Sequence, residues 1–353
     1  SRTWIRPSDS SLSSSRASDG TQCPSDAAER DPVTTKTQNT QISENAKSVD
    51  SVGKFVYRLL KAIPTWALWI LVVIWSIPTG SLFINSFRTR DAQRATGWWT
   101  SFTEGGWTFD NYIDVLSAQQ TGGLWQALIN SFAIAVPATV IPVTIAAMAA
   151  YAFAWIPFKG REWLFITTVA LMALPNQVAL LPLLQLFAGG AHWTIPGTGA
   201  VITFFPDLDL AGTPTAVWLT HTAFAMPFAI FLLHNYISAL PKELFEAARI
   251  DGANHFTIFW RLVVPLSVPA LAAFTIFQFL WTWNDYLVAL TMVGGNGASY
   301  PATILIASMA GEFGLREHLL SAGAFVQAGV PLLVFFFLQR YFVRGLLAGS
   351  VKS

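Results

Sequence analysis

Long apolar stretches separated by short polar connections set the pattern of this chain from about residue 54 onward. Each stretch carries few or no charged residues and reaches the roughly 20 residues that an α-helix needs to cross a hydrocarbon core. The pattern predicts an all-α membrane protein with six transmembrane helices. These helices are expected over residues 64–87, 125–157, 163–188, 214–236, 266–292 and 318–342.

Basic residues mark the connections that we expect on the cytoplasmic side: residues 54–61, 158–161 and 340–352. An excess of Lys and Arg is typical of cytoplasmic connections, so both termini are predicted to be cytoplasmic. The connection at 88–124 carries Arg88, Arg90 and Arg94 but also four acidic residues. Basic residues in long external loops have little influence on the orientation of the chain, so this connection is still expected to be external. Its aromatic residues either lie at the membrane interface or touch an external partner.

A charged segment at residues 238–265 interrupts the apolar pattern between the fourth and fifth stretches. Pro241 suits the first turn of a helix, and Gly252 suits the left-handed residue that ends one. Asn254 is a good N-cap for a second helix, which the pattern ends at Pro265. We therefore expect a short cytoplasmic helix-turn-helix whose apolar face holds Phe256, Phe259, Trp260 and Val263.

The first helix of this segment has the residues of a docking element. Ala247 and Ala248 are small enough for a partner's backbone to come close, and Glu246 offers a carboxylate to a cation or a backbone amide. The segment is therefore predicted to bind in a cleft of another protein. The alternative is an ordinary amphipathic cytoplasmic loop.

The composition agrees with a membrane protein. Hydrophobic residues make up 53% of the 353 residues and charged residues only 12%, against about a quarter in soluble domains. The net charge of +1 leaves no excess of basic groups for phosphates, so no nucleic-acid partner is expected. The single cysteine, Cys23, is expected to be a free surface thiol. Residues 1–50 are polar and are expected to be a disordered segment before a membrane domain over residues 51–353.

Motifs of several hydrolytic and metal-dependent enzymes are missing. The sequence contains no G-x-x-x-x-G-K-[ST] phosphate loop, no H-E-x-x-H zinc pair and no G-x-S-x-G nucleophile turn. We therefore expect a non-catalytic subunit with no metal and no cofactor of its own. A pathway-forming subunit driven by a separate ATPase fits both this absence and the docking segment.

Polar and aromatic side chains gather in one part of the fifth predicted span. Amides and carboxylates bond to hydroxyl groups and aromatic rings stack on sugar faces, so this group suits a substrate pathway. The group consists of Gln278, Trp281, Trp283, Asn284 and Asp285. The alternative is that Asp285 fixes helix contacts near the outer end of its helix. Other polar residues in or near the spans are expected to join helices: Asn176, Gln177, His221, Asn235 and Gln327.

The docking segment resembles the E-A-A motif in the membrane subunits of ATP-driven importers. Glu246, Ala247 and Ala248 are followed by three residues and Gly252, then by an apolar tail. The stretch W-N-D-Y-L-x-A-L at 283–290 and the ending from residue 339 resemble carbohydrate-uptake permeases of the maltose and maltodextrin type. Residues from about 318 onward look closest to α-glucoside transporters. The likeness covers about residues 54–353 and implies the type I ABC importer transmembrane fold.

The resemblance also implies partners. These are a second homologous permease, two cytoplasmic ATPase subunits that bind ATP and magnesium, an extracytoplasmic sugar-binding protein and the lipid of a prokaryotic inner membrane. It implies that the ATPase pair contacts the tail at 343–353 and the coupling residues Glu246, Ala247, Ala248, Arg249, Asp251 and Gly252. In some relatives the sugar contacts belong mainly to the partner permease.

By the same likeness, an outer turn enters the sugar cleft of the binding protein and helps to displace the substrate. This turn contains Gly294, Gly295, Asn296 and Gly297. The alternative is a flexible connector.

Three rival functions stay open at this level. An importer for a glycerol-phosphate or a polyol would share these features. A channel or a membrane-embedded enzyme would act without an ATPase, and a structural anchor would leave transport intact when it is deleted.

Overall fold

The computed structural model describes residues 64–117, 123–310 and 316–350, and side chains of the last helix as far as residue 337 and at 339. The chain divides into two compact units, Ser1–Ile74 and Trp75–Ser353. The first unit is described from Pro64, where helix α2 (Thr65–Ser86) is about to begin. Cys23, the expected disordered segment at 1–50 and its boundary with the membrane domain lie outside the described residues.

Every predicted span has a helical counterpart, and the expected helical fold is confirmed. Among the described residues, five stretches are long and apolar enough to cross a membrane: Thr65–Ser86, Gly123–Trp155, Pro214–Ile237, His255–Trp283 and Glu317–Phe337. A sixth counterpart is the bent pair Arg161–Ala173 and Asn176–Gly189. The helices are α6 (Gly123–Ala135), α7 (Pro137–Trp155), α8 (Arg161–Ala170), 3-10 helix η2 (Leu171–Ala173), α9 (Asn176–Gly189), α10 (Pro214–Ile237), α13 (Val264–Trp283) and α16 (Glu317–Ser350).

The third counterpart bends by 103° between η2 and α9. Leu174 is extended, with ψ at 126°, because proline disfavours the helical conformation in the residue before it. Pro175 is extended as well, and Asn176 starts the new helix. The sequence therefore contains the cause of the break, whereas the size of the bend comes from the structure.

The fifth span differs from the prediction at both ends. Pro265 does not end the second helix of the docking segment: α12 (His255–Ile258) runs through the π-helical turn η3 (Phe259–Val263) into α13. A π-helical turn shifts the backbone carbonyls, which relieves the clash between a proline ring and the carbonyl four residues earlier. At the other end α13 stops at Trp283 rather than near residue 292, and α14 (Leu287–Val293) is a separate helix.

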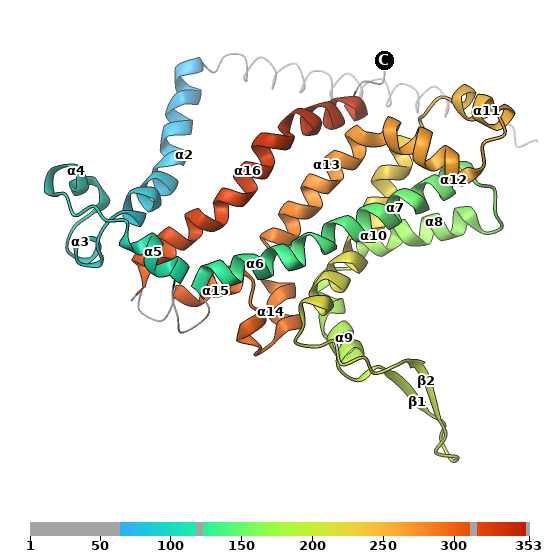
Figure 1. Cartoon of the computed structure of the whole chain (residues 1–353), viewed down its shortest axis with the longest axis horizontal. Helices are drawn as coiled ribbons and strands as arrows, with labels where there is room; N and C mark the ends of the chain where they lie inside the picture. The colour runs from blue at the N-terminus through green and yellow to red at the C-terminus, as the bar shows by residue number, and fades with distance from the viewer. Residues whose placement is uncertain (1–63, 118–122, 311–315, 351–353) are drawn as a thin grey trace, which may run out of the picture. The chain divides into compact units, whose positions relative to one another are not determined.

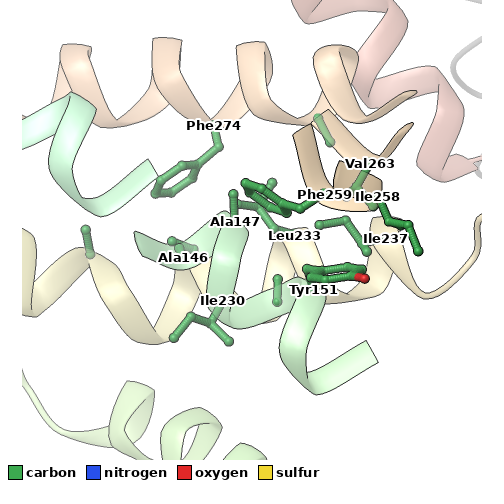
Figure 2. Packing of buried hydrophobic residues seen from close by; sticks show 14 of the residues in the cluster. Ala146, Ala147, Tyr151, Ile230, Leu233, Ile237, Ile258, Phe259, Val263 and Phe274 are labelled. Carbon is green, nitrogen blue, oxygen red and sulfur yellow. The ribbon is translucent and has the colours of Figure 1, made fainter. Parts of the chain in front are cut away.

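Three hydrophobic clusters hold Trp75–Ser353 together, and the largest lies between α7 and α10, which run side by side (Figure 1). Small residues such as Ala146, Ala147 and Ala229 are fully buried there, so the two backbones approach closely. Figure 2 shows Phe259 and Phe274, from η3 and α13, packed against this pair. The cluster therefore joins the docking segment to the spans.

The connections that were predicted to be external are more ordered than the sequence suggested. Residues 88–117 form α3 (Arg90–Ala95), η1 (Trp98–Thr100), α4 (Ser101–Glu104) and α5 (Asp110–Ser117). The loop after α9 contains an antiparallel hairpin, β1 (Ala191–Thr194) and β2 (Val201–Phe205), which Figure 1 shows extending beyond α9. The connection after α14 contains η4 (Gly297–Ser299) and α15 (Ala302–Met309). The Gly and Pro residues that predicted a loop occupy the ends of these short elements.

Candidate functional site

The docking segment begins with helix α11 (Lys242–Ile250), as the sequence predicted. Glu243 lies in its first turn and Arg249 in its last, so both charges oppose the partial charges of the helix ends. Gly252 follows with φ at +79°, a left-handed conformation that glycine adopts without strain. The amide N–H of Ala253 then donates to the carbonyl of Ala248 over 2.9 Å and closes the end of the helix.

One aromatic contact fixes α11 to the spans. Phe245 is only 1% exposed, and its ring stacks on Trp155 at the end of α7, with centroids 3.7 Å apart and planes 15° apart. The indole N–H of Trp155 donates to the carbonyl of Ile237, the last residue of α10, over 3.1 Å. Trp155 therefore connects α11 to the ends of both α7 and α10.

The second helix of the segment is fixed as well. The side chain of Asn254 accepts a hydrogen bond from the N–H of Thr257 over 2.8 Å, which confirms the predicted cap. The hydroxyl of Tyr151 on α7 lies 2.9 Å from Nδ1 of His255. The segment is thus held from two sides, by Trp155 and by Tyr151.

The opposite face of the segment is free for a partner. The expected coupling residues Glu246, Ala247, Arg249, Asp251 and Gly252 are exposed, and Ala248 is half-buried against the large cluster. The predicted single apolar face is wrong: Phe259 and Val263 are buried, whereas Phe256 is 71% exposed and Trp260 is also exposed. Ile250, which the sequence reasoning did not single out, is 86% exposed. Helical spacing alone does not show which of two adjacent apolar stripes faces the bundle.

We call this end of the bundle the α11 end and the opposite end the α14 end. Helix α10 connects them, because Ile237 lies beside Trp155 whereas Gly212, just before α10, donates its N–H to the carbonyl of Met292 in α14. With 24 residues, α10 separates the two ends by about 36 Å. The docking segment and the polar group of the fifth span therefore lie at different ends.

A hollow of about 660 Å³ opens at the α14 end. Three of the predicted pathway residues, Trp281, Asn284 and Asp285, line it together with Phe277, Leu280, Tyr286 and Leu287. Trp281 and Phe277 also line a second hollow of about 380 Å³ beside the bend between η2 and α9. Asn176, which was expected to join helices, lines this second hollow.

Gln278 does not line either hollow. Its side chain is fully buried, and its amide Nε2 donates to the carbonyl of Ala138 in α7 over 3.0 Å. Trp283 is also buried, and its indole N–H donates to the carbonyl of Gln327 in α16 over 3.3 Å. These two side chains join helices, and the residues of this group that line the 660 Å³ hollow are Trp281, Asn284 and Asp285.

Asp285 has two sets of contacts. Its Oδ2 accepts a hydrogen bond from the N–H of Ala289 over 2.9 Å, and its Oδ1 accepts a longer one from Val288, so the carboxylate caps α14. On the inner side, Nε2 of His221 in α10 lies 3.5 Å from Oδ2. The sequence reasoning grouped His221 with residues that join helices and did not connect it with Asp285.

The predicted outer turn lies at the same end. Gly294 has φ at +59°, as its glycine allows, and Gly294, Gly295, Asn296 and Gly297 are exposed. The amide Nδ2 of Asn296 donates to the carbonyl of Gly212 over 3.1 Å and to the hydroxyl of Ser299 over 3.2 Å. The turn is therefore bonded at Asn296 to Gly212, just before α10.

Metal ligands do not gather anywhere in the described ranges 64–117, 123–310 and 316–350: no group of three or more His, Cys, Asp or Glu side chains is placed to hold an ion.

Known proteins resemble this chain in sequence and in fold. The Osmoprotective compounds uptake permease protein GgtD of Synechocystis sp. is 50% identical over 291 residues, which cover 81% of this chain and 91% of the relative. The Alpha-glucoside transport system permease protein AglG of Rhizobium meliloti is 46% identical over 276 residues, which cover 76% and 68%. In the crystal structure of a bacterial alginate ABC transporter in complex with alginate pentasaccharide-bound periplasmic protein, one chain matches with a TM-score of 0.56 and 14% identity, covering 78% of this chain and 92% of that one.

The expected fold class, the type I ABC importer transmembrane fold, is therefore confirmed. A family model described as "Binding-protein-dependent transport system inner membrane component" matches residues 142–348, which include the docking segment, both hollows and the outer turn. With this match and the 50% identity to a permease, the chain belongs to the family of binding-protein-dependent transport system inner membrane components.

Proposed function

We propose that this chain is the permease subunit of an ATP-driven importer that carries a sugar, an oligosaccharide or an α-glucoside, across the cytoplasmic membrane. The observation that carries the proposal is the arrangement of α11. It presents Glu246 to solvent and is stacked through Phe245 on the end of α7, whose neighbour α10 runs from there to the α14 end, where the hollow opens. In this geometry, α11 connects an ATPase mechanically to the helices of the passage.

The ATPase side follows from this arrangement. Glu246, Ala247, Ala248, Arg249, Asp251 and Gly252 form the surface that a cytoplasmic ATPase pair grips, and Ile250 and Phe256 add exposed apolar contacts beside it. ATP and magnesium are bound by those partners, and this subunit is non-catalytic. The α11 end, both termini and the tail at 343–353 are then cytoplasmic. The tail reaches the ATPase pair.

The passage side supports a sugar. Trp281 offers a ring for a sugar face, whereas Asn284 and Asp285 offer groups that bond to hydroxyls. The relative from Rhizobium meliloti is named for α-glucosides, which is the substrate class that we propose here. A glycerol-phosphate fits less well, because the residues that line the hollow include a carboxylate and no Lys or Arg to attract a phosphate.

Two further partners complete the proposal. A second, homologous permease packs on the open side of the hollow and completes the wall of the passage. An extracytoplasmic sugar-binding protein docks at the α14 end, where the exposed turn of Gly294, Gly295, Asn296 and Gly297 enters its cleft. The hydrogen bonds of Asn296 hold the turn in position for this contact.

The mechanism is alternating access. ATP closes the ATPase pair, α11 moves with it, and the stacked ring of Trp155 passes this movement to α7 and α10. The passage opens outward, takes the sugar from the binding protein, and opens inward after hydrolysis. Coupling requires that the ATPase binds α11 differently in the two states.

The test uses the full transporter, reconstituted in vesicles with its second permease, ATPase and binding protein. We expect Glu246→Ala to abolish ATP-driven uptake of maltose, sucrose or trehalose and to weaken ATPase assembly. Glu243→Ala, an exposed carboxylate one turn earlier in the same helix, is the matched control and should keep both. Wild-type uptake by the Glu246 variant, or uptake by this chain alone, would overturn the proposal and favour a channel.

A further inference from the structure

His221 is an unusual residue for the interior of a span. It is 2% exposed, and neither of its ring nitrogens has a hydrogen-bond partner among the residues that the structure describes. A buried polar group without a partner costs about 1–3 kcal/mol, so such a side chain calls for a ligand or a role. Its Nε2 lies 3.5 Å from Oδ2 of Asp285.

The two side chains border a small enclosed space. Its volume is about 10 Å³, close to the minimum that holds one water molecule. Ser131 of α6 and Thr282 of α13, two residues with hydroxyl groups, belong to the same lining. A water molecule there has His221, Asp285 and these hydroxyls as possible partners, which is the number that buried waters require.

Asp285 is the residue that this enclosed space and the 660 Å³ hollow share in their linings. Its side chain is 12% exposed. Oδ2 faces inward, toward Ala289 and His221, whereas Oδ1 has one long bond of 3.4 Å to the N–H of Val288. Oδ1 therefore keeps most of its capacity to accept a hydrogen bond from a solute in the hollow.

We infer that His221 is a positioning residue for Asp285, and that Asp285 is the acceptor in this chain for a hydroxyl group of a neutral, polyhydroxylated solute. This inference rests on the proposed function, because it assigns the solute contact within that passage. His221 donates to Oδ2, directly or through the enclosed water, and fixes the carboxylate so that Oδ1 points to the hollow. Trp281, whose ring meets His221 at 6.3 Å edge to face, supplies the apolar wall beside the acceptor.

The charge of the site sets the solute class. A carboxylate bonds strongly to hydroxyl groups, which donate to it, and repels a phosphate or another anion. The residues that line the hollow contain no basic side chain to offset this repulsion. The site therefore selects neutral solutes rich in hydroxyl groups over anionic ones of similar size.

The experiment measures solute binding separately from docking and coupling. The purified complex of both permeases and the ATPase, held in its ATP-bound state without binding protein, is titrated with maltose, sucrose and trehalose by calorimetry. Glycerol 3-phosphate serves as the anionic probe. ATPase activity stimulated by the loaded binding protein is measured on the same preparations.

We expect His221→Leu and Asp285→Asn to weaken binding of the imported sugar about tenfold. Stimulated ATPase activity at saturating sugar should stay within about twofold of wild type. His221→Gln keeps a donor and should bind within about threefold of wild type. Thr222→Val is the matched control, since this hydroxyl bonds only to Trp218 of its own helix in the described structure and its loss should change nothing.

Other outcomes overturn the inference. Unchanged sugar binding in His221→Leu removes the positioning role, and tight binding of glycerol 3-phosphate to the wild type removes the solute class. If His221→Leu does not assemble, Asp285→Asn and His221→Gln decide: equal losses in both contradict the inference, and a loss in Asp285→Asn alone supports it. Failure of the wild type to import any sugar would instead refute the proposed function.

Discussion

The side-chain amide of Gln278 donates a hydrogen bond to the carbonyl of Ala138, 140 residues earlier in the chain, over 3.0 Å. Ala138 lies four residues before Pro142 inside α7, and proline has no N–H to donate to that carbonyl. Gln278 therefore replaces the missing bond of the helix. Trp283 does the same for Gln327 of α16, which lies four residues before Pro331. Helix α13 thus joins two neighbours through carbonyl groups that prolines have freed.

We predict that Gln278→Leu lowers the stability of the complex by about 0.6–2 kcal/mol, because the Ala138 carbonyl then has no donor in a span. Pro142→Ala restores a helical N–H four residues after Ala138. The double variant should therefore lose less stability than the sum of the two single changes. Thermal unfolding of the four variants of this cycle in detergent measures the coupling. Strict additivity would show that Gln278 does not act through that carbonyl.

These contacts also show where the sequence was informative and where it was not. Charge-poor stretches predicted every span, and Pro241 and Gly252 predicted α11 and its left-handed end, because both signals are local. The partner of Gln278 was not predictable, since Pro142 lies more than 130 residues away and only the packing of α7 on α13 brings them together. The π-helical turn before Pro265 was also missed: Phe259 and Val263 are buried in this turn, and their burial depends on packing that the sequence does not show.

In the candidate site, too, some features were predictable from the sequence and others were not. Trp281, Asn284 and Asp285 were predicted as a group, because a short polar interruption in an apolar stretch is visible in the sequence. The role of Gln278 in joining helices and the approach of His221 to Asp285 depend on which side of α13 faces α7 and α10. That rotation is set by packing and not by hydropathy.

We predict that Phe245→Ala uncouples the transporter. Removing a buried ring costs about 3–5 kcal/mol in a packed core, and here it detaches α11 from Trp155. ATP-driven sugar uptake should fall at least tenfold while the chain still inserts and assembles with the second permease. Uptake and stimulated ATPase activity in vesicles measure the effect.

Two controls accompany this change. Phe245→Leu keeps most of the apolar volume and should retain a large part of the uptake. Phe102→Ala removes an exposed aromatic ring from α4 and should leave uptake and ATPase activity unchanged. Full coupling in Phe245→Ala would show that α11 is held by other contacts.

We predict that Arg88→Lys destabilises the segment at 88–117. The Arg88 guanidinium is buried and donates to the carbonyls of Ala92 and Thr96, to the hydroxyl of Thr96 and to the side chain of Asn85. A lysine ammonium does not reproduce the planar set of donors of the guanidinium. Hydrogen bonds from a charged group contribute about 1.5–3 kcal/mol each, and the lysine loses some of them. Cleavage of this segment in limited proteolysis should accelerate.

Arg94→Lys is the matched control, because Arg94 lies on the exposed surface of the same segment. Its cleavage rate should equal that of the wild type. If the Arg88 variant is also cleaved at the wild-type rate, the hydrogen bonds of the Arg88 guanidinium do not stabilise the segment.

We predict that substitutions at Gly252 act through the backbone. An added Cβ meets no atom within 4 Å among the described residues, so there is room for a side chain. The φ of +79° is the difficulty, since a left-handed conformation costs an ordinary L-residue about 1–2 kcal/mol, and asparagine tolerates it better than alanine or valine. ATP-driven uptake should therefore decrease in the order wild type, Gly252→Asn, Gly252→Ala and Gly252→Val.

The order of the Asn and Ala variants separates two explanations for glycine at this position. If the ATPase cleft leaves no space for a side chain, the larger asparagine should impair uptake more than alanine does. If the end of α11 requires a left-handed residue, asparagine should impair it less, because its backbone keeps the bond from the Gly252 N–H to the carbonyl of Arg249 at 3.0 Å. Uptake rates of the two variants at equal assembly decide between steric fit in the partner and the shape of α11 itself.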